Sequence, residues 1–137
     1  MTITVEPMDE ADVQTFVRIE LEAFRSHLRM PMMWPRGYTD DLYAFYDDRK
    51  MESYNDSKQC LIKAVDNETG KIIGASEWTF AVDPTADGKK PHVDPNEQPP
   101  PNWPKEGNWP LRLFFKVEWE KWRREALDER PYIGIIV

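Results

Sequence analysis

Apolar residues recur along the chain at two spacings, and the change of spacing separates strands from helices. Ile3 and Val5 alternate with polar residues, which predicts a short strand over 2–8. A second pattern begins after Asp9, a residue type that favours helix N-termini, and it predicts an amphipathic helix over 9–25. The apolar residues at this helical spacing are Val13, Phe16, Val17, Leu21 and Phe24.

Further along the chain, a loop, a second helix and a hairpin are predicted. Residues 29–38 contain two prolines and a glycine, which predicts a loop. Thr39 precedes a predicted helix over 40–54, which carries Leu42, Phe45 and Tyr46 on one face. Two β-prone runs, 59–66 and 71–82, flank the glycine-containing segment 67–70 and predict a β-hairpin.

Residues 83–110 hold eight of the twelve prolines of the chain, which excludes a regular helix or strand there. The segment is predicted to be a long insertion loop, and Trp103 and Trp109 indicate that it packs on the body of the domain. A third helix is predicted over 111–129, followed by Pro131 and a final strand over 132–137. The apolar stripe of this helix is Leu111, Phe115, Trp119, Trp122 and Ala126.

Length and charge exclude several classes of protein. At 137 residues we expect a single domain, 1–137. The formal net charge of −7 and the lack of a basic stripe disfavour nucleic acid and anionic membrane surfaces as partners. No apolar stretch approaches membrane-spanning length, and no signal peptide opens the chain, so we expect a cytoplasmic protein.

Metal binding and cysteine chemistry are not expected. His27, His92 and Cys60 are far apart and lack the spacing of metal ligands. Cys60 lies in an apolar run and is interpreted as a small buried hydrophobe.

Together, the predicted strands and helices give an α/β fold class, with a twisted, mostly antiparallel sheet of about four strands and three helices.

The order of the elements resembles the amino-terminal half of the GCN5-related N-acetyltransferases (the GNAT family), over nearly the whole chain. It is most similar to fungal members that carry a proline- and tryptophan-rich insertion between the third strand and the third helix. The matching stretches are DEADVQTFVRIELEAF, CLIKAVDNETGKIIGASEW, PPPNWPKEGNW and RPYIGIIV. The element order adds more to this likeness than any single motif.

The resemblance implies an enzyme that transfers an acetyl group from acetyl-CoA to a small amine or a peptide amine. In the family, the fourth strand leads into a glycine-rich loop whose backbone N–H groups hold the pyrophosphate of acetyl-CoA. This sequence contains no Gly-x-Gly, and it ends at the predicted fourth strand. We therefore expect a GNAT-like fold truncated before the acetyl-CoA loop, with weak or absent activity and cofactor binding.

Candidate site residues follow from the resemblance. The backbone of the fourth strand would hold the thioester carbonyl, with plain sheet pairing as the alternative. Glu77 would be the general base if it faces the cleft, and otherwise an ordinary strand residue exposed to solvent. The cofactor residues are Gly134, Ile135, Ile136 and Val137. The acceptor residues are Phe24, His27, Met33, Trp34 and Trp78, for which loop packing and a surface histidine are the alternative.

Three accounts of the function stay open. The chain is an incomplete enzyme, a noncatalytic protein-interaction module derived from one, or a partner in a site completed by another chain. The unpaired apolar edge of strand 132–137 predicts a homodimer, with the proline-rich loop as the alternative cover. Residues 99–104, PPPNWP, also fit a polyproline ligand of SH3 or WW domains, although a packed insertion is the preferred interpretation.

Overall fold

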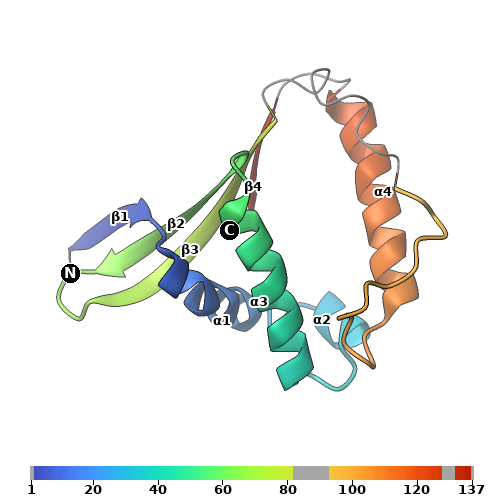
Figure 1. The fold of residues 1–137 in the computed structure, drawn as a ribbon, viewed down its shortest axis with the longest axis horizontal. Coiled ribbons are helices and arrows are strands. Elements are labelled where there is room, and N and C mark those ends of the chain that lie inside the picture. Colours follow the sequence, from blue (N-terminus) through green and yellow to red (C-terminus); the bar gives the residue numbers. More distant parts are fainter. Residues whose placement is uncertain (1, 82–92, 128–131, 137) are drawn as a thin grey trace.

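The computed structural model describes residues 2–81, 93–127 and 132–136 (Figure 1). Within these residues, no helix is long and apolar enough to cross a membrane. The elements in chain order are β1 (Ile3–Pro7), the 3₁₀ helix η1 (Glu10–Asp12), α1 (Val13–Ala23), α2 (Arg29–Met33), α3 (Asp40–Asn55), β2 (Gln59–Asp66), β3 (Lys71–Ala81), α4 (Trp109–Leu127) and β4 (Tyr132–Ile136).

The strands form one open antiparallel sheet in the order β1-β2-β3-β4, which confirms the α/β class and the four-stranded sheet. The predicted hairpin is confirmed as β2 and β3. Gly70 closes its turn with a φ of +68°, a conformation that glycine adopts without a steric penalty. The backbone N–H of Gly70 donates to the carbonyl of Asp66 at 2.7 Å.

Helices α1 and α3 cover one face of the sheet (Figure 1). Met8, Val13, Phe16 and Leu61 form a buried cluster between α1 and β2. A second buried cluster joins α1, α2 and α3 through Val17, Leu21, Met30, Met33, Trp34 and Leu42. The predicted apolar faces of the first two helices are therefore the faces that build the core.

The prediction of a loop over 29–38 is wrong for its first five residues, which form α2. Met30 and Met33 are three residues apart, so a single helical turn buries both. Pro31 lies in the first turn, where its missing N–H removes no helical hydrogen bond. Gly37 lies beyond the helix with a φ of +75° and turns the chain toward α3.

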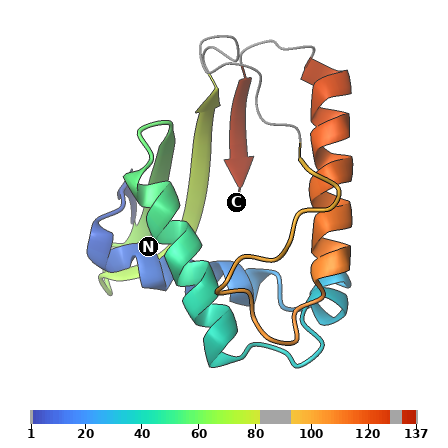
Figure 2. The ribbon, with the colours of Figure 1, turned by 45° about the vertical axis from the view of Figure 1, so that its right-hand side comes forward.

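The described part of the insertion, 93–108, has turns but no helix or strand, as predicted. It runs beside α4 to the lower end of α3 (Figure 2). The centroid of the Trp103 ring lies 5.0 Å from that of Trp34 and 5.1 Å from that of Phe45. This confirms that the insertion packs on the body of the domain; residues 82–92 lie outside the described residues.

Helix α4 begins two residues earlier than predicted, and its apolar stripe divides in two. Leu111 and Phe115 pack against the core cluster of α1, α2 and α3. Trp119 and Trp122 continue the same stripe but are 72% and 67% exposed. The predicted end of the helix at 129 lies outside the described residues.

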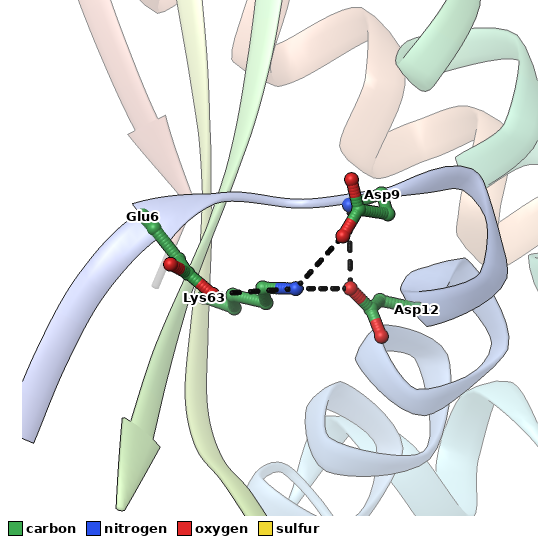
Figure 3. A network of polar contacts seen from close by, with 4 residues as sticks. All are labelled: Glu6, Asp9, Asp12 and Lys63. Atoms are coloured by element: carbon green, nitrogen blue, oxygen red, sulfur yellow. Dashed lines mark hydrogen bonds and ion pairs between the residues drawn. The ribbon is translucent and has the colours of Figure 1, made fainter. Parts of the chain in front are cut away.

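A buried lysine joins the start of α1 to the sheet (Figure 3). The Lys63 ammonium on β2 lies 2.5 Å from a carboxylate oxygen of Asp12, 3.2 Å from one of Asp9 and 3.5 Å from one of Glu6. The hydrogen bond to Asp12 raises the pKa of Lys63 and lowers the pKa of Asp12. These contacts fix the entry of the chain into the first helix.

Candidate functional site

The predicted base, Glu77, lies on β3 under α3 and is 7% exposed. Its two carboxylate oxygens have different partners. The Lys50 ammonium lies 2.6 Å from Oε2, and the Ser53 hydroxyl donates to Oε1 at 3.0 Å. Glu77 is therefore not exposed to solvent but held in a buried polar cluster between β3 and α3.

A second carboxylate faces the same ammonium group. Glu20 Oε2, from α1, lies 3.1 Å from Lys50 Nζ as an ion pair. This oxygen is buried, and no described residue donates a well-aligned hydrogen bond to it. The Lys50 ammonium also lies 4.1 Å from the centroid of the Phe16 ring, a cation–π contact. Two carboxylates and an aromatic ring thus surround one primary ammonium.

The register of the sheet brings this cluster beside β4, the strand whose backbone is predicted to hold the thioester carbonyl. Glu77 is the direct partner of Ile136, and Thr79 is the partner of Gly134. Of the predicted cofactor residues, Gly134–Ile136 therefore pair with the stretch of β3 that contains Glu77. Val137 lies outside the described residues.

The predicted acceptor residues do not all come together. Phe24 packs against the buried cluster that contains Met33 and Trp34. His27 is exposed, and its Nδ1 accepts a hydrogen bond from the backbone N–H of Arg29 at 3.2 Å. Trp78 follows Glu77 directly on β3, so its side chain projects from the other face of the sheet.

Trp34 also lines a cavity of about 260 Å³ between the loop after α2 and the insertion. Its charged walls carry an ion pair, in which the Arg36 guanidinium lies 2.9 Å from a carboxylate oxygen of Glu106. Asp41 accepts a hydrogen bond from the backbone N–H of Lys105 at 3.1 Å. Because Arg36, Glu106 and Asp41 already have partners, this cavity is a weaker candidate than the buried cluster.

Sequence reasoning missed Glu20, Lys50 and Ser53, although a signal for Lys50 was present. Lys50 follows Leu42 and Tyr46 at intervals of four residues, so it belongs to the buried face of the second predicted helix. A charged residue at such a position needs a buried partner of opposite charge. The partner's identity, Glu77 or Glu20, depends on the packing of α1 and α3 on the sheet.

No model of a known protein family matches the chain, and no curated protein matches it at a significant level of similarity. Among the described residues, no group of three histidine, cysteine, aspartate or glutamate side chains is placed to hold a metal ion.

Proposed function

We propose that this chain forms the acceptor side of a GCN5-related N-acetyltransferase, an enzyme that transfers an acetyl group from acetyl-CoA to an amine. The observation that carries the proposal is the pairing of Glu77 with Ile136. A carboxylate suited to an ammonium group stands next to the strand whose backbone would hold the thioester. The antiparallel order β1-β2-β3-β4, with α1 and α3 between the first two strands, supports the same proposal.

Glu20 is proposed as the group that first meets the acceptor amine. Glu77 is engaged by both Lys50 and Ser53, whereas the one partner of Glu20 Oε2 in the described part of the chain is Lys50, through an ion pair. A carboxylate oxygen accepts more than one donor, so Glu20 retains capacity for a second ammonium or amine. In this proposal Glu77 receives the proton of the amine after the Lys50 ammonium moves away from Oε2.

The residues of this chain do not fit the pyrophosphate of acetyl-CoA. The printed sequence contains no Gly-x-Gly. Backbone N–H groups of such a turn are the usual ligands of a pyrophosphate. We therefore derive no step through the cofactor and assign only the acceptor side to these residues.

The test is a titration of the intact chain with primary amines, followed by tryptophan fluorescence. Saturable binding of at least one amine is expected, and Glu20→Gln is expected to weaken it at least tenfold, because a charged partner is lost. Glu52→Gln is the matched control, since Glu52 is exposed on α3. A chain that binds no amine, or a control variant as weak as Glu20→Gln, would rule out the acceptor site.

A second experiment addresses the cofactor directly. Calorimetric titration with acetyl-CoA is expected to show a dissociation constant weaker than micromolar, because each missing charge-assisted contact to the pyrophosphate removes about 1.5–3 kcal/mol. Micromolar binding by the chain would contradict the assignment of these residues to the acceptor side alone.

One observation favours a second function, a protein-interaction module that associates through the edge of the sheet. Strand β4 is the last strand in the order, so one of its edges has no strand partner among the described residues. Ile133 on this strand is 62% exposed. An apolar strand with an unpaired edge is a template for another strand, including the same strand of a second copy.

A further inference from the structure

Three arginine side chains from three helices lie near neighbouring aromatic rings. The Arg49 guanidinium lies 5.8 Å from the centroid of the Phe45 ring, which itself lies 5.8 Å from that of Tyr46, and the charges of Arg29 and Arg112 act on Tyr46. Arg29 begins α2, Arg49 follows Tyr46 by three residues on α3, and Arg112 lies in the first turn of α4. The Arg29 guanidinium lies 5.3 Å from the centroid of the Phe115 ring, one turn beyond Arg112 on α4. Tyr46 and Phe115 pack against the same core cluster. The three helices therefore bring three positive charges to one corner of the molecule.

The acidic side chains that the structure describes do not pair with these guanidinium groups. Within the described residues, none of the three takes part in a side-chain hydrogen bond or an ion pair. Arg112 is partly buried, and its pKa is lowered by burial and by the like charges of Arg49 and Arg29. Glu20 opposes that shift, but its carboxylate already faces the ammonium of Lys50.

The acidic residues beside Arg49 in the sequence have other partners. Asp47 interacts with the charge of Arg18, and the carboxylate of Asp48 accepts a hydrogen bond from the Asn102 side chain at 2.8 Å. Within the described residues, neither aspartate forms an ion pair with one of the three arginines.

The local charge has the opposite sign to that of the whole chain. The three arginines supply three positive charges here, and Glu20, which interacts with Arg112, supplies one negative charge. The chain as a whole carries a formal net charge of −7. Holding like charges together at a partly buried position opposes folding, and an anionic ligand would remove that penalty.

Two neutral hydrogen-bond donors complete the corner. Burial raises the pKa of Tyr46, so its hydroxyl stays protonated at neutral pH. The indole Nε1–H of Trp34 is buried and has no well-aligned hydrogen-bond acceptor among the described residues, although it lies close to the Tyr46 side chain. Unpaired donors beside unpaired guanidinium groups are what an oxygen-rich anion requires.

We propose that Arg29, Arg49 and Arg112, with the Tyr46 hydroxyl, form a binding site for a carboxylate or phosphate group of a small molecule. The planar fork of a guanidinium matches the oxygens of either group, and three forks from three helices give the site both charge and direction. The inference does not depend on the acetyltransferase proposal, because the groups proposed to contact the anion are the three arginines and Tyr46, none of which is proposed to contact the amine.

The test is a titration of the intact chain with inorganic phosphate, and separately with acetate, at constant ionic strength. The Nε–H signals of Arg49 and Arg112 are followed by nuclear magnetic resonance. We expect a saturable shift of both signals with at least one anion, and the stronger of the two identifies the source of the oxyanion. The Arg25 Nε–H, which donates to Glu22 at 2.8 Å, is expected not to shift.

Matched variants separate a ligand site from a structural role. Arg49→Gln is expected to weaken anion binding about tenfold or more, whereas Arg25→Gln leaves it unchanged. Without an anion, Arg49→Gln is expected to melt at the same temperature as the native chain or higher, because a repulsion is removed. A lack of saturable shifts, equal weakening by both variants, or a lower melting temperature for anion-free Arg49→Gln would overturn the proposal.

Discussion

At the scale of single residues, the charged side chains buried under α3 form the site proposed for the acceptor amine. Lys50 is the centre of this arrangement, because it joins carboxylates from α1 and β3. Removing one member of a buried ion pair leaves an uncompensated charge, which is far more costly than the loss of an exposed pair. The proposed amine site and the stability of the fold therefore share one residue, Lys50.

The substitution Lys50→Met tests this dependence. It leaves the carboxylates of Glu20 and Glu77 without a cation, and we expect the free energy of unfolding to fall by about 3–5 kcal/mol. Urea denaturation measures the change. Lys71→Met is the control, because Lys71 is exposed at the start of β3 and should change the free energy of unfolding by less than about 0.5 kcal/mol. Equal effects of the two variants would show that Lys50 is not an internal ion partner.

Asp12 gives the fold a sensitivity to acid. The hydrogen bond from Lys63 lowers the pKa of Asp12 below its ordinary value of 3.8. The contribution of the Asp12 carboxylate to the free energy of unfolding is therefore complete above that value. It is lost as the pH falls through the lower pKa of the folded state. We expect the urea concentration at the unfolding midpoint to decrease as the pH is lowered below about 4. In Asp12→Asn this decrease should be less steep. Glu10→Gln, an exposed neighbour, should keep the native slope.

At the scale of the elements, the sequence predicted the strands better than the connections between them. The hairpin was predictable because its apolar runs and Gly70 are local signals. Helix α2 was not, because Pro31 and Pro35 suggested a loop, whereas burial of Met30 and Met33 favours one helical turn. The contacts between Glu77, Lys50 and Glu20 depend on three separate elements, so no local pattern could reveal them.

The insertion packs closely on the body at Gly107, and a substitution there tests this contact. A Cβ atom there would lie 2.6 Å from the Trp34 ring and 2.7 Å from Trp103 Nε1. Gly107→Ala is therefore expected to lower the free energy of unfolding by about 1–3 kcal/mol, as overpacking does. In Gly74→Ala the new Cβ meets Ala64 at an ordinary 3.6 Å, so the change should be small. Thermal denaturation compares the two, and a neutral Gly107→Ala would show that the insertion is loosely held.

At the scale of the whole molecule, apolar surface remains exposed on α4 and β4. Trp119, Trp122 and Ile133 are each more than 60% exposed. If β4 associates with a second copy, sedimentation of the intact chain should show a dimer, and Ile133→Lys should shift it toward the monomer. A monomer at high concentration would exclude the homodimer. It would also contradict the proposal that the chain associates with a second copy through the edge of β4.

The central claim is that the buried cluster of Glu20, Lys50 and Glu77 is the place where an acceptor amine binds. Backbone amide signals from nuclear magnetic resonance, recorded while the best-binding amine is added to the intact chain, locate that place most directly. The account predicts saturable shifts concentrated at Glu20, Ser53, Glu77 and Ile136. Shifts confined to the cavity beside Trp34 and Gly107, or no saturable shift, would contradict it.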